Sequence, residues 1–342
     1  MKSGWLVALW LALPPVVEIR PLLATDPVSA DPDDPAVWVN RADPARSLIL
    51  GTNKVAAPQG SISVFGLDGK TRQTIRGLDR PNNIDVEYGL PLGGESVDLA
   101  VATERFERRL RVYRVDEKGL RDIGSVPVFQ GQSGEAAAPM GIALYKRPRD
   151  GAVFAIVGRK TGPRNGYLWQ YRLEDNGKGR VRGVKVREFG RFSGGMAEIE
   201  AIAVDDELGH VYYADEGDGI HKYNADPDAP SGELAHFGRQ GFRGDREGIA
   251  IYARPGGKGY VVCTDQIPGS SEYRIYPREG VQSEPVKIVR GGADSTDGLE
   301  IASSALGPRF PHGLMVAMNS GARNFLVFPW EMVAATGQPK LP

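Results

Sequence analysis

The chain is poor in cysteine, histidine and net charge, and each shortage excludes a class of protein. Cys263 is the only cysteine in 342 residues, so no internal disulfide can form, and we expect it to be a small core residue. The four histidines, His210, His221, His236 and His312, show no zinc-ligand spacing, which disfavours zinc as a bound metal. A net charge of −1 lacks the basic excess of a general nucleic-acid binder, so no nucleic-acid partner is expected.

Long hydrophobic runs are missing after residue 30, so no transmembrane helix is expected there. The chain starts MKSGWLVALWLALPP, in which an apolar run from Trp5 to Leu13 follows Lys2. The run is too short to span a bilayer, and two prolines bound it, as in a secretory signal peptide. We therefore predict a signal peptide at residues 1–24 and a single domain at 25–342, secreted or periplasmic. A misplaced start or a buried N-terminal segment is the alternative.

Turn-forming residues, in contrast, are plentiful, with 44 glycines and 25 prolines, and they separate six stretches that look like copies of one another. The period is roughly 50 residues, as for propeller blades of four strands. First strands are expected at 35–39, 84–88, 140–145, 199–204, 248–252 and 298–301. Second strands are expected at 48–51, 97–102, 153–157, 211–214, 260–263 and 314–317. Helical periodicity is scarce, and the best helix candidate, at 329–335, is short.

A third strand in each copy ends on an aromatic residue, which we expect to pack between copies: Phe65, Tyr113, Tyr171, Tyr223, Tyr276 and Phe328. Outer strands are expected at 73–76, 124–129, 184–189, 233–237 and 286–289. The sixth copy runs out of chain near Ala335, so residues 16–30 are expected to supply its outer strand. The sequence therefore predicts an all-β, six-bladed propeller of four-stranded antiparallel blades, closed by an N-terminal strand. A β-sandwich, the alternative, would not carry one motif six times.

Acidic and amide residues recur at the start of the first strands: Asp31, Asp33, Asp34, Asn82, Asn83, Asp85, Glu87, Glu198, Glu200, Asp245, Glu247, Asp294, Asp297 and Glu300. The innermost strand of each blade lines the axial channel, so these side chains should meet at one mouth. Carboxylates gathered without cations repel one another. Ca²⁺ accepts about six to eight oxygen ligands in flexible geometry, which suits ligands drawn from several blades. Several calcium ions are therefore the expected cofactor.

The ends of the second strands are sorted by charge. The first three copies end in Lys54, Arg105 and the pair Arg159–Lys160. The last three end in Asp215–Glu216, Asp265–Gln266 and Asn319. A single acid at a strand end is usually solvated or part of a turn. That does not explain why the starts of the first strands and the ends of the second strands carry charges sorted by sign across the six copies. A half-basic, half-acidic rim with metal ions is typical of a receptor for a multiply charged oxyanion such as phosphate.

The residues at these positions resemble those of the β-propeller phytases, the calcium-dependent alkaline phytases, from about Asp31 to Ala335. The motifs are DDPAVW (33–38), TNK (52–54), NNIDV (82–86), ATER (102–105), YYADE (212–216), DREG (245–248), STDG (295–298) and FPWE (328–331). The resemblance implies a six-bladed propeller that removes phosphates from calcium phytate. One departure is the stretch 318–322 (MNSGA), which stands where the family often has an acidic segment.

The resemblance also implies roles for single residues. It implies channel calcium ligands at Asp33, Glu200, Asp245, Glu247 and Asp297, with Glu216 or Asp215 as a further ligand. It implies phosphate-binding cations at Lys54, Arg105 and Lys160, to which the rim pattern adds Arg159. Asp34 and Pro35 match a structural calcium site. The catalytic set is then Lys54, Arg105, Lys160, Glu200, Asp245 and Glu247.

We interpret the chain as a monomeric phosphoric monoester hydrolase of the 3-phytase type. It would act on phytate or other inositol polyphosphates by direct attack of a metal-activated water, with the rim cations stabilising the phosphoryl oxygens. No covalent intermediate is expected, because no His or Cys nucleophile is placed to form one. The alternatives are a calcium-dependent sugar lactonase, which needs no three basic rim groups, and a non-catalytic binding propeller.

Overall fold

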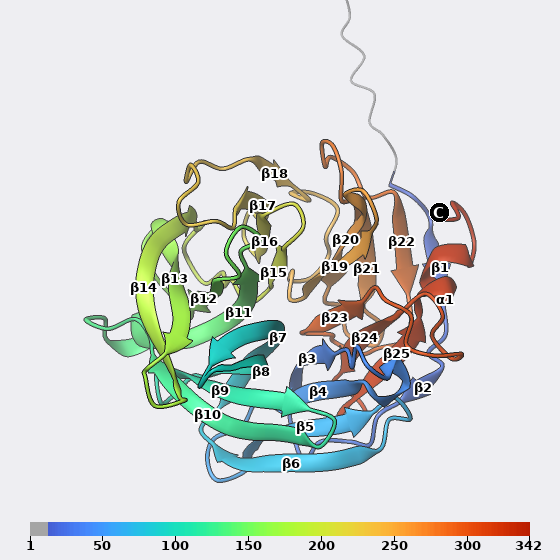
Figure 1. The fold of residues 1–342 in the computed structure, drawn as a ribbon. Helices are drawn as coiled ribbons and strands as arrows, with labels where there is room; N and C mark the ends of the chain where they lie inside the picture. The colour runs from blue at the N-terminus through green and yellow to red at the C-terminus, as the bar shows by residue number, and fades with distance from the viewer. Residues whose placement is uncertain (1–12) are drawn as a thin grey trace, which may run out of the picture.

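A computed structural model describes residues 13–342, and this part of the chain folds as an all-β propeller (Figure 1). The first twelve residues of the predicted signal peptide lie outside the described residues. The strands form five sheets within the described part of the chain, and these sheets are built mainly from runs of consecutive antiparallel strands. We call each such run of strands a meander.

The first two meanders follow the expected order. The first consists of β3 (Pro32–Trp38), β4 (Leu48–Asn53), β5 (Gly60–Gly66) and β6 (Thr71–Leu78). The second consists of β7 (Pro81–Leu92), β8 (Glu95–Glu104), β9 (Arg109–Asp116) and β10 (Gly119–Pro127). The third, which consists of β11 (Pro139–Lys146), β12 (Val153–Arg159), β13 (Asn165–Asp175) and β14 (Val181–Arg191), shares one sheet with the second. The two are joined by a parallel pairing of β10 with β14 at Gly124 and Val181.

The remaining meanders have shorter strands. The fourth consists of β15 (Ile202–Asp205), β16 (His210–Asp215), β17 (Gly219–Asn224) and β18 (Ala235–Phe237). The fifth consists of β19 (Ile249–Arg254), β20 (Lys258–Asp265), β21 (Glu272–Pro277) and β22 (Lys287–Arg290). The sixth has β23 (Leu299–Ala302), β24 (Leu314–Asn319) and β25 (Asn324–Pro329), followed by the short helix α1 (Trp330–Ala335), which confirms the helix candidate. Short 3-10 turns lie at Pro44–Arg46 and Gly134–Ala137.

The first strands of the six meanders surround the centre of the molecule (Figure 1). Each is in contact with the next, from β3 through β7, β11, β15 and β19 to β23, and β23 is in contact with β3. Together they line an axial cavity of about 200 Å³. Side chains that face inward from distant parts of the sequence therefore share one space.

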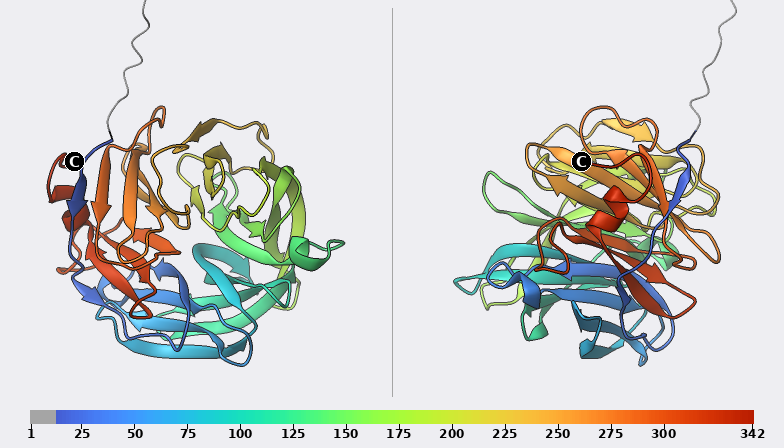
Figure 2. Two further views of the ribbon diagram at one scale, coloured as in Figure 1. Left: turned by 180° about the vertical axis from the view of Figure 1, so that it is seen from behind. Right: turned by 90° about the vertical axis from the view of Figure 1, so that its right-hand side faces the viewer.

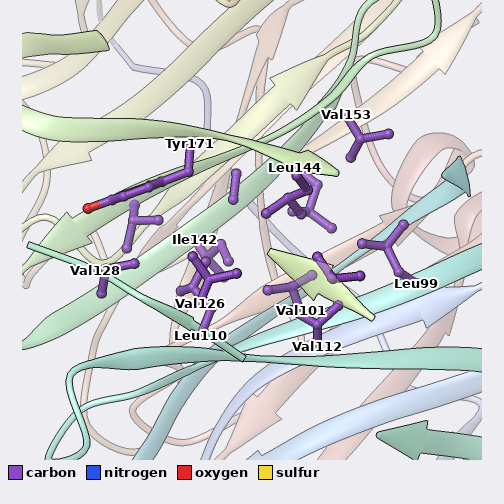
Figure 3. Packing of buried hydrophobic residues seen from close by; sticks show 14 of the residues in the cluster. Leu99, Val101, Leu110, Val112, Val126, Val128, Ile142, Leu144, Val153 and Tyr171 are labelled. Atoms are coloured by element: carbon purple, nitrogen blue, oxygen red, sulfur yellow. The ribbon is translucent and has the colours of Figure 1, made fainter. Parts of the chain in front are cut away.

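Hydrophobic clusters fill the gaps between neighbouring meanders. The cluster in Figure 3 joins β8 and β9 of the second meander to β11 and β12 of the third through residues such as Leu99, Val112, Ile142 and Leu144. The six aromatic residues at the third strands fall into six different clusters. Each is at most 3% exposed, which confirms that they pack between the repeats. Cys263 on β20 is also fully buried, as expected of a core residue.

The N-terminal segment runs along the outside of the last two meanders (Figure 2). Strand β2 (Leu23–Ala24) pairs antiparallel with β25 and takes the outer position of the sixth meander. Strand β1 (Val16–Glu18) instead pairs parallel with β22, so this part of the 16–30 segment joins the fifth meander. Both strands fall within residues 1–24, the predicted signal peptide, and both are paired in sheets of the propeller. Residues 13–342 include no helix long and apolar enough to cross a membrane.

Candidate active site

One backbone hydrogen bond recurs at the axial mouth and identifies equivalent positions in the six repeats. The N–H of Lys54 donates to the carbonyl of Asp31 at 2.7 Å, and the N–H of Arg105 donates to the carbonyl of Arg80 at 3.1 Å. The other donor–acceptor pairs are Lys160–Ala138, Glu216–Glu198, Gln266–Asp245 and Ser320–Asp294. The rim residues are therefore Lys54, Arg105, Lys160, Glu216, Gln266 and Ser320.

A β-bulge turns the start of the first strand toward the mouth. In the first meander, Pro32 pairs with Asn53 and Pro35 pairs with Gly51, so Asp33 and Asp34 both face Thr52. The same shift places Asn82 and Asn83 opposite Thr103, and Met140 and Gly141 opposite Gly158. Because a bulge adds one residue to a strand, it re-aims the neighbouring side chains. Two adjacent acids, Asp33 and Asp34, can thus both point into the axial space.

The residue before each rim position points the other way, because strand side chains alternate. Asp215 accepts hydrogen bonds from the N–H and the hydroxyl of Ser193, both at 2.6 Å. Asp265 accepts from the N–H groups of Arg243 and Gly244, at 3.0 and 2.8 Å. These carboxylates are fully buried and hold the incoming loops. Of the two alternatives predicted as a calcium ligand, Glu216 faces the mouth and Asp215 does not.

Arg159 is the residue before the rim position in the third meander. Its side chain therefore points away from the mouth and does not reach the rim, contrary to the prediction. Its guanidinium donates to the carbonyls of Tyr167 and Gly166, at 3.0 and 2.8 Å. The same group lies over the rings of Phe129 and Trp169, at 5.0 and 5.4 Å from their centroids. Arg159 is 1% exposed and serves the packing of the sheet, so Lys160 alone carries the positive charge at this place.

The three rim cations each meet a carboxylate from another repeat. Lys54 Nζ contacts Asp33 and lies 3.3 Å from Asp297 Oδ2. Arg105 Nη2 lies 3.4 Å from Glu200 Oε1. These contacts bring together charged side chains of the first, second, fourth and sixth meanders.

Three further polar residues belong to the same network but were left out of the predicted catalytic and metal sets. Glu198 contacts Lys160 Nζ, and Gln266 donates to Asp297. Asn82 donates to Glu200 Oε2 at 3.0 Å and accepts from Arg105. Glu198 and Asn82 lie at the start of a first strand, and Gln266 lies at the end of a second strand. These are the recurring positions of the sequence pattern, so the pattern itself indicates all three residues.

Burial raises the pKa of most carboxyl groups at the mouth. Burial, then Asp245 and Glu200, raises the pKa of Glu216 to about 8. Burial and the charge of Glu200 raise the pKa of Glu247 well above its ordinary value. Burial also raises the pKa of Asp33 and of Asp297, although Lys54 opposes it. Without a metal, these carboxyl groups therefore hold their protons to a higher pH than isolated carboxyl groups, because burial and mutual repulsion disfavour their charged forms.

Lys54 remains charged in this setting. Burial alone would lower its pKa, but Asp33, Glu200 and Asp297 raise the pKa well above the ordinary value of lysine. Lys160 differs, because burial and then the nearby Arg105 lower its pKa. The two lysines therefore have different environments, although they occupy equivalent rim positions.

A second set of acids lies in the axial cavity: Asp34, Asp85, Glu87, Asp206 and Glu300. Asp34 Oδ2 accepts the N–H of Ile84 at 2.9 Å, and Asp85 Oδ2 accepts the N–H of Leu144 at 2.7 Å. These bonds link the first strands of neighbouring meanders. Pro35, the other predicted structural ligand, lines the same cavity. Asp245 is exposed in the loop before β19, with its charge close to Glu216.

The fold and the mouth together define a class of protein: a β-propeller with a charged axial site suited to multiply charged anions. The family model described as Phytase matches residues 16–336, and the chain belongs to this family. The chain is 35% identical to the 3-phytase of Bacillus subtilis (strain 168) over 335 residues, covering 91% of this chain and 83% of that protein. Membership makes this chain a phosphatase of the phytase type.

Two solved structures are similar to this chain at low sequence identity. BBS1N in complex with ARL6DN is 11% identical with a TM-score of 0.48, covering 88% of this chain and 78% of that chain. The β-propeller domain of Myceliophteria thermophila Cps50 (Swd1) is 13% identical with a TM-score of 0.49, covering 86% and 82%. At these scores neither structure supports an argument about function.

Proposed function

We propose that the protein is a calcium-dependent phosphomonoester hydrolase that releases phosphate from phytate and related inositol polyphosphates. The observation that carries the proposal is the arrangement of Lys54, Arg105 and Lys160 beside carboxylates of other repeats at one mouth. Donors of fixed position stabilise charge on phosphoryl oxygens, and such stabilisation is the main contribution of a protein to phosphoryl transfer.

The proposed architecture is a ring of six blades, each formed by one meander. Six interfacial clusters, six successive contacts between first strands and six equivalent rim hydrogen bonds support this count. Strand β2 would close the ring by supplying the outer strand of the sixth blade. We further propose a monomeric, exported protein whose leader ends before Val16, since β1 and β2 belong to the folded domain.

The residues of the mouth fit calcium. Oδ1 of Asp33 contacts Lys54, but Oδ2 of Asp33 and Oε2 of Glu247 have no hydrogen-bond partner in residues 13–342, although both atoms are buried. Unpaired buried carboxylate oxygens are the donors that a hard divalent cation prefers. The ligands would come from Asp33, Asp34, Pro35, Glu200, Glu216, Asp245, Glu247 and Asp297. When bound, calcium neutralises these carboxylates, polarises phosphoryl oxygens and lowers the pKa of a bound water.

The protein's own groups bind and orient the substrate. Lys54, Arg105 and Lys160 come from three consecutive repeats, so they can contact a phosphate from one side of the mouth. Glu200 and Asn82 fix the guanidinium of Arg105, which presents its remaining donors to an anion. A neighbouring phosphate on the same inositol ring would meet the carboxylate side of the mouth, where calcium compensates its charge. This arrangement favours polyphosphates over simple monoesters.

Direct attack by water is the proposed chemistry. Burial raises the pKa of the Cys263 thiol to about 12, and the residue is enclosed in β20, so it does not act as a nucleophile. The reaction then needs no covalent phosphoryl-enzyme intermediate. In H₂¹⁸O with unlabelled phytate, the released phosphate should carry one labelled oxygen, with no burst that exceeds steady turnover.

The deciding experiment measures phosphate release from phytate by purified protein with Ca²⁺ and with excess EDTA, together with hydrolysis of a sugar lactone. We expect release only with Ca²⁺ and no lactone hydrolysis. Undiminished release in EDTA would remove calcium from the proposal. Lactone hydrolysis without phosphate release would favour the lactonase alternative, and phytate binding without turnover would leave a binding propeller.

A further inference from the structure

Two histidines that are 15 positions apart in sequence face each other in the fourth meander. Strands β17 and β18 pair in a register that places His221 directly opposite His236. Their imidazole rings stack with centroids 4.2 Å apart and an interplanar angle of 14°. Directly opposed cross-strand residues have side chains close enough to share a ligand. The sequence spacing did not indicate this pair, because only the register of the hairpin creates it.

Asp218 adds a carboxylate to the pair. It lies in the turn between β16 and β17, and its Oδ2 is 3.6 Å from His236 Nε2. Its backbone carbonyl oxygen is 3.1 Å from the same nitrogen. One ligand-type atom from each of Asp218, His221 and His236 lies within 4.8 Å of the others.

His221 supplies a second, independent indication of a ligand. Its side chain is 1% exposed, and its Nδ1 lies 2.8 Å from Glu233 Oε1. A carboxylate at Nδ1 holds the proton there and leaves the lone pair at Nε2. Within residues 13–342, Nε2 of His221 has no hydrogen-bond partner, although it is buried. A carboxylate behind a histidine whose other nitrogen is free is the usual outer arrangement of a metal-binding imidazole.

We propose that Asp218, His221 and His236 form a binding site for a Zn²⁺ ion, separate from the calcium-binding mouth. Two imidazoles with one carboxylate match the ligands of zinc, whereas Ca²⁺ takes oxygen ligands. A water molecule or the carbonyl of Asp218 would complete four-fold coordination. A metal binds in the plane of an imidazole ring, so coordination requires His236 to rotate out of its stack with His221 and to release the carbonyl of Asp218. The side chains of Asp218 and His236 are 31% and 22% exposed, which leaves room for this rotation.

The charges around the site allow a cation to enter. Arg239 Nη2 lies 3.5 Å from Asp218 Oδ1, but the arginine side chain is 62% exposed. An exposed contact of this length contributes little, so the guanidinium can move into solvent when an ion binds. His236 also borders a surface hollow of about 360 Å³, which provides a route from solvent.

The ion would fasten a short outer strand of the propeller. Strand β18 is only three residues long and pairs with β17 over three residues. A metal held by His221, His236 and Asp218 would tie this outer strand to the β16–β17 turn. The same turn carries the rim residue Glu216, two positions before Asp218. Zinc binding would therefore stabilise the fourth meander and the turn beside the mouth.

The test is a Zn²⁺ titration of chelator-stripped protein in saturating Ca²⁺, which occupies the oxygen-ligand sites, against a chromophoric zinc indicator. Wild type should bind one equivalent of Zn²⁺, and His236→Gln and Asp218→Asn should each bind at least about 10-fold more weakly. His312→Gln, which changes an exposed histidine elsewhere, is the matched control and should bind like wild type. Circular dichroism verifies that each variant is folded.

Two further measurements separate this site from adventitious binding. Co²⁺ in place of Zn²⁺ should give visible absorption in wild type and His312→Gln but not in His236→Gln. Glu233→Gln should weaken zinc affinity by about 10- to 100-fold, because the carboxylate orients His221. Absence of zinc binding by wild type, or equal binding by wild type and His236→Gln, would overturn the proposal.

Discussion

Lys54 and Asp297 are 243 positions apart in the sequence, yet Lys54 Nζ lies 3.3 Å from Asp297 Oδ2. Lys54 also contacts Asp33, so one cation joins a first-repeat acid to a sixth-repeat acid. The contact exists because β23 and β3 lie side by side where the chain returns to its start. A substitution at Lys54 therefore tests both the contact between the first and sixth repeats and the proposed phosphate site.

Replacement of Lys54 by Met should lower kcat/KM for phytate by about 10²- to 10³-fold, because a charged donor to the phosphoryl oxygens is lost. Phosphate release with Ca²⁺ measures the effect. Lys70→Met is the control: Lys70 is exposed, pairs with Asp26 on the outer side of the first meander and should change activity little. Near-normal turnover by Lys54→Met would exclude this lysine from catalysis.

Asp245→Ala should also remove most turnover in the same assay, because Asp245 is one of the proposed calcium ligands.

Substitution of the two arginines of the predicted substrate site should have different effects, one on catalysis and the other on stability. Arg105→Lys should raise KM or lower kcat with little change in Tm, because the guanidinium at the mouth fixes the substrate. Arg159→Lys should lower Tm, because it loses two backbone hydrogen bonds and the contacts with Phe129 and Trp169. Calorimetry and phytate kinetics on both proteins check this. A folded, stable Arg159→Lys with strongly raised KM would contradict the assignment.

Gly141 is needed for close approach between the third and fourth repeats. A Cβ at this position would collide with the backbone carbonyl of Glu200. Gly141→Ala should therefore displace Glu200, destabilise the fold by about 1–3 kcal/mol and reduce phosphate release. Denaturant unfolding measures the first effect. Gly232→Ala is the control, since a Cβ there meets no atom within 4 Å and the residue has no positive φ.

The metal-free protein should lose stability as the pH rises. Burial, then Asp206, raises the pKa of Glu87 from 4.5 to about 9. A raised folded-state pKa means that the stability contributed by the proton is complete below about pH 4.5 and is lost as the pH approaches 9. Burial also raises the pKa of Asp206 to about 6 and that of Glu300 to about 8, in the same direction.

Calorimetric scans in EDTA between pH 5 and about 9 should show Tm falling, and Glu87→Gln should flatten the decline because the glutamine cannot ionise. Glu279→Gln, at an exposed position, should retain the slope of wild type. An EDTA-treated wild type whose Tm rises over this interval would show that these carboxyl groups do not control stability.

The pattern of residues alone was enough to locate most strands, their repetition and the sorting of charge along the chain. Apolar alternation and a recurring aromatic residue identify the strands, because a strand with one buried face must alternate and each interface needs a large side chain. Phe65 and Tyr276 were assigned to packing on this basis, and both are buried between repeats. Charge at strand ends predicted a shared mouth, because a closed ring brings equivalent positions together.

The choice between two adjacent residues at the mouth could not be made before the strands were seen paired. Arg159 and Lys160, or Asp215 and Glu216, differ by one position, and a shift of one residue in a strand reverses the side to which a side chain points. The backbone bonds at the rim fix that register. The pairing of His221 with His236 has the same origin, since it depends on the alignment of β17 with β18 rather than on distance along the chain.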